Sequence, residues 1–180
     1  MEISRFEIEG PVLISPKIFA DDRGYFYESF NYAAFEKAGL ETAFVQDNQS
    51  LSKKGALRGL HFQNPPYAQG KLVRVVKGAV IDVAVDIRKN SPTYGRHIKV
   101  ELTGDNKLML WIPPGFAHGF ITLEDDTMFI YKCTNLYHKE SESGIIWNDA
   151  ELNIDWGTDH PLVSQKDLQL SSFTNCDNRF

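Results

Sequence analysis

The chain lacks any long hydrophobic segment. No apolar run approaches the roughly 20 residues that a membrane-spanning helix needs, and the first residues, Met1 to Arg5, lack the apolar core of a secretory leader. A basic excess is also missing, because 19 lysine and arginine residues stand against 24 acidic ones, for a net charge of −5. These absences argue against a membrane protein and a nucleic-acid-binding protein. A local basic cluster can still bind phosphate on an acidic protein.

Cysteine is scarce as well. Cys133 and Cys176 are far apart and fit no metal-binding or redox spacing. Two reduced thiols are typical of the cytoplasm, where we expect the protein to reside. The sequence also has no internal repeat, low-complexity tract or linker, so we expect a single domain over residues 1–180.

What the sequence does have is short apolar segments separated by frequent turn residues, which is typical of a β sandwich or barrel. Glycines punctuate its middle at positions 55, 59, 70, 78, 95, 104, 115 and 119. Strands are expected over 25–30, 43–51, 97–102, 107–112, 119–123 and 128–133. One helix is expected over 32–38, with Asn31 as N-cap and Gly39 after its end. A second short helix is expected in the last third, which makes a mainly β fold of jelly-roll type.

Residues 71–87 read as a hairpin that turns at Lys77-Gly78. On its return strand Asp82 and Asp86 share a face with Val80 and Ala84, and only apolar residues occupy the opposite face. Two acids on one strand face are unusual for a packed core. That face either meets solvent or lines a polar cavity inside a barrel, and the pattern does not choose between them.

Four side chains are candidates for proton chemistry or ligand binding. His61 would alternate with Arg58, Leu60 and Phe62 along a strand, and in a cavity its neutral imidazole can act as a base. The alternative is a structural histidine bonded to backbone. His118 is either a turn residue that opens a strand or a ligand contact. Tyr131 either packs in the core or donates a proton, and Asp167 matters if it reaches His61.

The basic residues among these candidates would form a diphosphate clamp if they converged on one cavity. They are Arg23, Arg58, Lys71 and Lys166.

A metal is not expected. Small β barrels often bind one through two histidines one residue apart, but Gln63 takes the second position here and no acid follows before Gly70. His61 and His118 alone would make a poor metal site.

Taken together, these segments resemble the dTDP-4-dehydrorhamnose 3,5-epimerase family, the rhamnose-pathway epimerases of the cupin superfamily. The resemblance spans the whole chain and implies a cupin-type jelly-roll (double-stranded β-helix) barrel. It is carried by residues 19–26, 46–50, 57–63, 68–75, 82–88, 114–120, 131–132, 144–149 and 164–167. Departures are few: Phe62 replaces a common tyrosine, and Lys139, Ala150 and Gly157 replace common prolines.

The resemblance also implies roles. It makes His61 the general base, Asp167 its orienting partner, Tyr131 the general acid and Lys71 the group beside the ketone oxygen. Tyr137 would stack on the thymine. The other implied substrate contacts are Arg23, Glu28, Gln46, Asn48, Arg58, His118, Glu142 and Lys166. The family is dimeric with exchanged N-terminal strands, so Arg23 and Glu28 would serve the partner's site, and it needs no cofactor or metal.

The expected activity is inversion of C3 and C5 of dTDP-4-keto-6-deoxy-D-glucose through an enolate, in dTDP-L-rhamnose biosynthesis. Three alternatives remain open. The first is an enzyme on the same nucleotide sugar that inverts one carbon or moves the ketone. The second is a metal-dependent cupin oxygenase or isomerase. The third is a sugar-binding module without catalysis.

Overall fold

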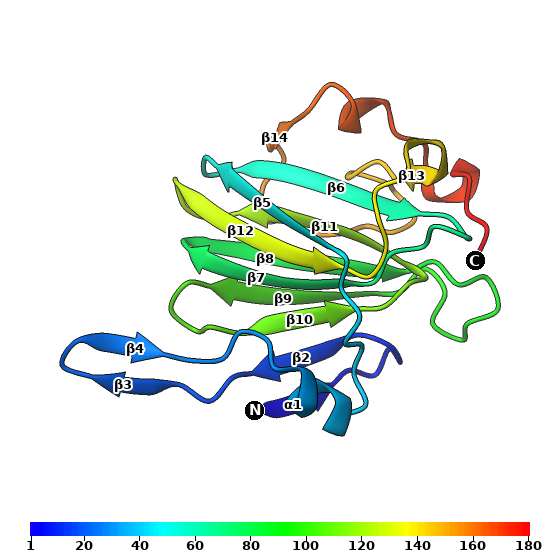
Figure 1. The fold of residues 1–180 in the computed structure, drawn as a ribbon. Coiled ribbons are helices and arrows are strands. Elements are labelled where there is room, and N and C mark those ends of the chain that lie inside the picture. Colours follow the sequence, from blue (N-terminus) through cyan, green and yellow to red (C-terminus); the bar gives the residue numbers. More distant parts are fainter.

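Two sheets packed face to face make up the body of the computed structural model, which describes all 180 residues (Figure 1). The first sheet has the order β1 (Glu2–Arg5), β2 (Val12–Ser15), β10 (Met109–Ile112), β7 (Lys71–Lys77), β12 (Thr127–Cys133), β5 (Gln46–Ser52). The second has the order β13 (Glu142–Gly144), β6 (Ala56–Gln63), β11 (Phe116–Thr122), β8 (Ala79–Asp86), β9 (His97–Thr103). All of these pairs are antiparallel, and β14 (Leu162–Val163) adds a parallel pair to β6.

From β5 to β12 the chain passes repeatedly between the two sheets. Strands β5, β7, β10 and β12 belong to the first sheet, whereas β6, β8, β9 and β11 belong to the second. Such alternation is the topology of a jelly roll, and the predicted mainly β, cupin-type fold is confirmed.

The space between the sheets holds one apolar cluster. Val73, Val75 and Phe129 from the first sheet meet Val80, Ala84 and Phe120 from the second. The outer face of the second sheet is covered by the C-terminal segment through Ile145, Leu152, Ile154, Trp156 and Phe173 (Figure 1). The helix α1 (Tyr32–Lys37) covers the outer face of the first sheet with Phe35. The space between the sheets and the outer face of the second sheet are therefore buried, whereas β5 of the first sheet stays exposed at Asp47, Gln49 and Leu51.

The predicted helix is confirmed with its caps. Asn31 Oδ1 accepts a hydrogen bond from the Ala34 amide at 3.1 Å, and Gly39 follows the end of the helix with a φ of +67°. The last third contains only short 3₁₀ helices, η1 (Lys139–Ser141), η2 (Asp167–Gln169) and η3 (Phe173–Asn175). No helix has the length and apolar character needed to cross a membrane.

The hairpin prediction for residues 71–87 is wrong in its pairing. The turn at Gly78 exists, but β7 bonds to β10 and β12 while β8 bonds to β9 and β11. The two strands diverge because each pairs with strands of a different sheet. The polar face of β8 points inward. Asp82 and Asp86 are both fully buried, so the solvent-facing alternative is excluded.

A β bulge in β6 overturns the simple alternation expected there. On β11, His118 pairs with His61 and Phe120 with Arg58, so three steps on β6 match two on β11. Gly59 absorbs the extra residue at φ +128°, where a Cβ would lie 2.5 Å from Gly119 Cα. Leu60 and Phe62 therefore face the C-terminal cluster, whereas Arg58 and His61 both face the cavity.

Several strand ends differ from the expected ones. Strand β11 begins at Phe116, so His118 lies inside a strand and is buried, contrary to the prediction that it opens one. Strand β5 starts at Gln46 instead of residue 43, and β10 at Met109 instead of residue 107. Strand β4 (Gly24–Phe26) ends early because Phe30 turns away to pack on Phe35 and Phe44.

Strand β3 (Phe19–Asp21) and β4 form a two-stranded arm that projects from the body (Figure 1). Every residue of both strands is exposed, and Phe26 and Tyr25 keep 66% and 56% of their surface in solvent. Aromatic side chains are rarely left so exposed unless another surface covers them.

Candidate active site

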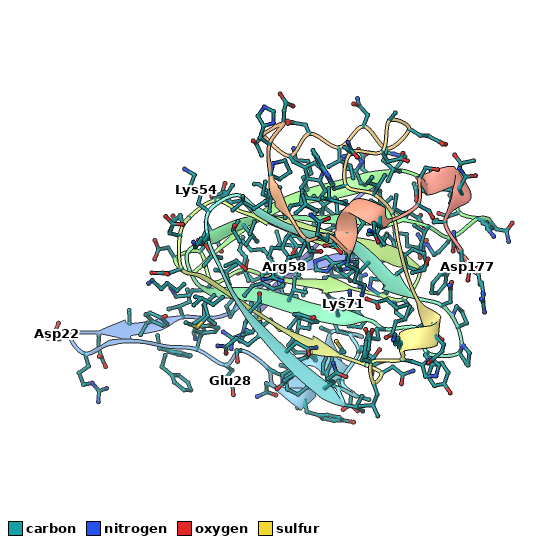
Figure 2. All side chains as sticks on the ribbon, turned by 90° about the horizontal axis from the view of Figure 1, so that it is seen from above. Asp22, Glu28, Lys54, Arg58, Lys71 and Asp177 are labelled. Carbon is teal, nitrogen blue, oxygen red and sulfur yellow. The ribbon has the colours of Figure 1, made fainter.

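A cavity of about 550 Å³ opens between the two sheets. Its walls come from β5, β7 and β12 of the first sheet, from β6 and β11 of the second, and from the segment that leads into η2. The lining residues are Asn48, Gln49, Ser50, Ala56, Leu57, Arg58, His61, Lys71, His118, Phe120, Tyr131, Ser164, Lys166 and Asp167. Figure 2 shows Arg58 and Lys71 in this central region, far from the arm that carries Asp22.

A second cavity of about 200 Å³ adjoins the first and shares Asn48, His61, Lys71 and Tyr131 with it. It adds Gln46, Phe62, Gln63, Gln69, Tyr137 and Glu142. The shared residues stand where the two spaces meet, so a ligand of two parts would have them at its middle.

His61 is oriented by Asp167. The Nε2 atom of His61 lies 2.7 Å from Asp167 Oδ1, and the Gly59 amide donates to Asp167 Oδ2 at 3.4 Å. Burial opposes charge on the Asp167 carboxyl, but its hydrogen bonds to His61 and Gly59 outweigh burial and lower the pKa. An ionised carboxylate can only accept a hydrogen bond, so Asp167 selects the tautomer in which His61 Nε2–H donates and leaves Nδ1 of His61 as the basic atom.

Tyr131 stands on the opposite wall. It belongs to β12 of the first sheet, whereas His61 belongs to β6 of the second, and both line the same two cavities. Burial raises the pKa of the Tyr131 phenol above its usual value, and the nearby Cys133 and Glu142 act in the same direction. The phenol therefore keeps its proton at neutral pH and can donate it.

Lys71 lies beside Cys133 in the register of β7 and β12 and faces the cavity. Burial lowers the pKa of the Lys71 ammonium, and electrostatic interactions with Cys133, Asp82 and Glu142 oppose that shift. Lys71 is the one lysine or arginine that lines both cavities.

A connected group of polar side chains lies along the two cavities. Lys166 Nζ lies 2.7 Å from both Glu142 carboxylate oxygens, and the Tyr137 hydroxyl donates to Glu142 at 2.8 Å. The Tyr137 amide donates to Gln46 Oε1 at 2.9 Å, and Gln46 Nε2 donates to Asn48 Oδ1 at 3.1 Å. Five of the residues implied by the family resemblance are thus fixed in one network.

Arg58 keeps its charge available for a ligand. Its guanidinium donates to the Ser52 hydroxyl at 3.2 and 3.3 Å, and it forms no salt bridge. Nearby in the wall, Ser50 Oγ is the sole buried side-chain oxygen or nitrogen without a hydrogen-bond partner. Sequence reasoning missed Ser50, because a serine in a strand carries no distinguishing signal.

Two of the expected substrate contacts lie outside the cavity. The side chain of Arg23, at the tip of the arm, is 90% exposed and pairs with Asp21 at 2.6 Å. Glu28 lies apart from Arg58 and Lys71 (Figure 2) and accepts a hydrogen bond from Asn31 at 2.9 Å. Within one chain these two residues do not join the other eleven implied site residues, which line the two cavities.

His118 also lines the cavity, and it pairs with Asp82 behind it, with its Nε2 atom 2.9 Å and 3.0 Å from the carboxylate oxygens. The two cavity histidines thus each have a carboxylate at Nε2. No group of three or more histidine, cysteine, aspartate and glutamate side chains is arranged to hold a metal ion.

The profile of the family described as dTDP-4-dehydrorhamnose 3,5-epimerase matches residues 5–175. A protein of that name from Escherichia coli K12 is 55% identical over 172 residues, which cover 94% of this chain and 93% of the relative. This chain belongs to the dTDP-4-dehydrorhamnose 3,5-epimerase family. The family resemblance inferred from the sequence is confirmed.

Solved structures of the epimerase family superpose closely on the chain. One is the dTDP-6-deoxy-D-glucose-3,5-epimerase of Legionella pneumophila in complex with dTDP-4-keto-L-rhamnose, with a TM-score of 0.92, 48% identity and coverage of 97% of this chain and 93% of the other. Another is ChmJ, a 3′-monoepimerase from Streptomyces bikiniensis in complex with dTDP-quinovose. Its TM-score is 0.89 at 33% identity, with 94% and 86% covered. The fold of these epimerases therefore accommodates inversion at two centres or at one.

Proposed function

We propose that this protein is a dTDP-4-dehydrorhamnose 3,5-epimerase, an isomerase that inverts C3 and C5 of dTDP-4-keto-6-deoxy-D-glucose in dTDP-L-rhamnose biosynthesis. The observation that carries the proposal is the pair of opposed proton-transferring groups. His61 with Asp167 stands on one sheet and Tyr131 on the other, around one cavity. The family membership of the chain supports the same reaction.

His61 is the proposed base. Protons on the carbons beside a ketone are weakly acidic, and their removal leaves an enolate. With Asp167 holding Nε2–H, Nδ1 of His61 is free to accept the proton, and the imidazolium that forms is stabilised by the buried carboxylate.

Tyr131 is the proposed acid. Because it faces the cavity from the other sheet, a proton that it gives to the enolate arrives on the opposite side of the sugar ring from His61. The configuration of that carbon is then inverted. His61 then releases its proton to solvent and Tyr131 takes one up from solvent, and the same two steps at the carbon on the other side of the ketone complete the conversion.

Lys71 is the proposed partner of the ketone oxygen, where negative charge develops in the enolate. An ammonium in a partly dry site stabilises that charge far more than water does. One positioned acid and one base typically contribute ~10²–10⁴-fold each, so much of the rate must come from this charge stabilisation and from orientation.

The nucleotide supplies that orientation. Arg58 and Lys166 are the proposed clamp for the diphosphate, since both line the larger cavity and Arg58 has no carboxylate partner. The unpartnered Ser50 hydroxyl beside them supports an oxygen-rich ligand there. Tyr137, half exposed at the rim, is the proposed stacking surface for thymine. The remaining proposed substrate contacts are Gln46, Asn48, His118 and Glu142.

The test is incubation with dTDP-4-keto-6-deoxy-D-glucose in heavy water, coupled to a reductase that forms L-rhamnose. We expect deuterium at both C3 and C5 and formation of the L-sugar. A protein that binds thymidine diphosphate but exchanges no proton would instead be a sugar-binding module, and the proposal would be rejected.

A single-centre epimerase is the second candidate, because a 3′-monoepimerase shares this fold at a TM-score of 0.89. NMR of the product separates the two: inversion and deuterium at one carbon only would favour the monoepimerase. A ketoisomerase would instead give a product in which the carbonyl has moved.

We further propose that the reaction needs no cofactor and no metal, since His61 and His118 each direct one ring nitrogen at a carboxylate. Metal analysis of the purified protein tests this against a metal-dependent cupin. Near-stoichiometric iron, zinc or manganese, with activity lost on chelation, would contradict it.

The assembly we propose is a homodimer with exchanged arms, in which Arg23 and Glu28 reach the partner's cavity. The exposed aromatic residues of the arm and its distance from the body support this (Figure 1). Light scattering is expected to give twice the chain mass.

We also propose a cytoplasmic location, because Cys133 and Cys176 are unpaired thiols. Cell fractionation would test this proposal.

A further inference from the structure

Two loops beside the smaller cavity are bonded to each other. The first, residues 64–70, connects β6 to β7, and the second, residues 134–141, connects β12 to β13. At one end the Gly70 amide donates to Thr134 Oγ1 at 2.8 Å, and the Thr134 amide donates to the Gly70 carbonyl at 3.0 Å. The second loop carries Tyr137, the one residue of either loop to which the proposed reaction assigns a role.

The other end of the two loops is joined by a pair of stacked rings. Tyr67 and His138 lie face to face, with ring centroids 3.7 Å apart and planes 5° from parallel. At that separation the rings are in van der Waals contact. His138 Nδ1 also lies 3.0 Å from Ser141 Oγ, and the Asn64 amide donates to the Ser141 carbonyl at 2.8 Å. The two loops therefore run antiparallel and hold each other at both ends.

Gln63, the last residue of β6, links the two loops from below. Its side chain is buried. Nε2 donates to the Tyr67 carbonyl at 2.6 Å and to the Leu136 carbonyl at 3.2 Å, and Oε1 accepts from the His138 amide at 2.8 Å. Both hydrogens of the Gln63 amide are thus used within the protein, although the residue lines the smaller cavity. Gln63 is therefore built to hold the loops and not to donate to a ligand.

These contacts set the direction of the Tyr137 ring. The backbone of His138 is extended, with φ −131° and ψ 107°, and successive side chains on extended backbone point to opposite sides. The His138 ring accordingly stacks on Tyr67, while Tyr137 lines the cavity. Because Tyr137 is 54% exposed, packing of its own does not hold its ring, and the contacts of its neighbour do.

We infer that Gln63 and the stacked pair of Tyr67 and His138 are positioning residues, which hold the Tyr137 ring in the cavity wall where the nucleobase of the substrate binds. The inference rests on the proposed function, which makes Tyr137 the stacking surface for thymine. A ring that is already fixed loses less freedom when the base stacks on it, so binding is tighter. The three residues act through Tyr137 and exchange no proton with the substrate.

The test is Tyr67→Ala, with dTDP and inorganic pyrophosphate as the two probes of binding. Stacking of a base on an aromatic ring is a substantial part of the affinity for a nucleotide, so the Kd of dTDP is expected to rise by about fivefold or more. The Kd of pyrophosphate is expected to stay within about twofold, since the diphosphate clamp is unchanged. The KM of the substrate is expected to rise with the Kd of dTDP, at a kcat within about twofold of the wild type. Tyr67→Phe, which keeps the ring, is expected to restore wild-type values.

Gln63→Met tests the link between the loops separately. Methionine has a similar length but donates to neither carbonyl, so the Kd of dTDP and that of pyrophosphate are expected to change as in Tyr67→Ala. Unchanged dTDP affinity in both variants would overturn the inference. If Tyr67→Ala does not fold, His138→Ala removes the other ring of the stack, and the same expectations apply to it.

A double variant shows whether the stack acts through Tyr137. Tyr137→Ala alone is expected to weaken dTDP binding, and adding Tyr67→Ala is expected to weaken it no further, because no ring is left to position. Additive losses would overturn the inference. Wild-type dTDP affinity in Tyr137→Ala would reject the proposed thymine contact, and the inference with it, whereas a loss in Tyr137→Ala without one in Tyr67→Ala would reject the inference alone.

Tyr94→Ala is the matched control. Tyr94 is 38% exposed against 39% for Tyr67, and it packs on Phe173 away from both cavities. Its affinity for dTDP is expected to match that of the wild type. A loss as large as in Tyr67→Ala would show that removal of any half-exposed tyrosine ring weakens binding, and the inference would be rejected.

Discussion

Replacing His61 with alanine, or Tyr131 with phenylalanine, removes one proton-transferring group and leaves the basic wall of the cavity in place. We expect kcat to fall by ~10²–10⁴-fold in each variant, since general acid–base steps contribute on that scale. Affinity for dTDP, measured by calorimetry, is expected to change little because neither group belongs to the diphosphate clamp.

Tyr94→Phe is the control, since it removes a phenol that packs on Phe173 away from both cavities. A fully active His61→Ala enzyme would refute the assignment of the base. Complete epimerisation by Tyr131→Phe, with deuterium still entering both carbons, would refute that of the acid.

At the residue scale the sequence identified most of the cavity wall. His61, Lys71, Tyr131 and Asp167 were predicted together and line one space. Asp82 was noticed as an acid in an apolar strand but not assigned a role, because its meaning depends on His118, 36 positions away. A buried acid without a nearby basic residue in sequence is the signal that would have pointed to it.

At the scale of elements, the bulge in β6 brings Arg58 and His61 to the same side. The substitution Gly59→Ala would place a Cβ 2.5 Å from Gly119 Cα, which would force β6 and β11 apart. It would also put an alanine at a φ of +128°, which strains its backbone, and both effects would destabilise the fold. Strain of this kind alone costs about 1–3 kcal/mol, and we expect a loss above that range in urea unfolding, together with lost activity.

Gly157→Ala provides the comparison for that prediction. Its φ is also positive, at +75°, but a Cβ there meets nothing within 4 Å. A loss of about 1 kcal/mol is expected, as for a glycine replaced in a left-handed conformation. Equal losses in the two variants would show that the approach of β6 to β11 has no energetic role.

The connection from β8 to β9 is held by Asp86. Burial opposes its charge, but hydrogen bonds from Arg88, Ser91 and Thr93 lower the pKa from 3.8 to about 2. Because the folded-state pKa lies below the unfolded one, this stabilisation is complete above pH 4 and disappears as the pH falls through 2. The shift corresponds to about 2 kcal/mol.

We therefore expect the unfolding free energy of the wild type to decrease between pH 4 and pH 2, and to decrease less in Asp86→Asn. Urea titrations at pH 7, 4 and 2.5 would measure the difference. Parallel pH dependences in the two proteins would contradict the account of Asp86.

The elements that sequence reasoning predicted well are those with local causes. Helix α1 depends on Asn31 and Gly39 within a few residues of it. The pairing of β7 and β8 was mispredicted because three of their four partner strands, β10, β11 and β12, lie 30 or more positions further on. The alternation in β6 failed because the contact of Gly59 with Gly119 does not show in the sequence.

At the scale of the whole molecule, exchanged arms predict that two defective chains can repair each other. A dimer of Arg23→Ala with His61→Ala would contain one complete site, formed by the His61 of one chain and the Arg23 of the other. Co-expression at equal levels gives mixed dimers in half of the population, and we expect about a quarter of the wild-type activity.

The control is the pair His61→Ala with Tyr131→Phe. Both residues line the same chain's cavity, so no mixed dimer contains a complete site and no activity should return. If co-expression of Arg23→Ala with His61→Ala also restores no activity, the arm does not serve the partner.

The single domain over residues 1–180 also stays a prediction, and one cooperative unfolding transition would support it.

The aromatic pair below the cavity has a consequence for redesign. Phe120 of β11 stacks on Phe129 of β12 with ring centroids 4.0 Å apart, and these rings join the two sheets. The base and the acid are carried by those same two sheets, so the gap that a sugar ring must fit is set by core volume, not by the reactive groups. An engineer who wants a wider or narrower ring to react would therefore begin with these two phenylalanines and leave the histidine and tyrosine untouched.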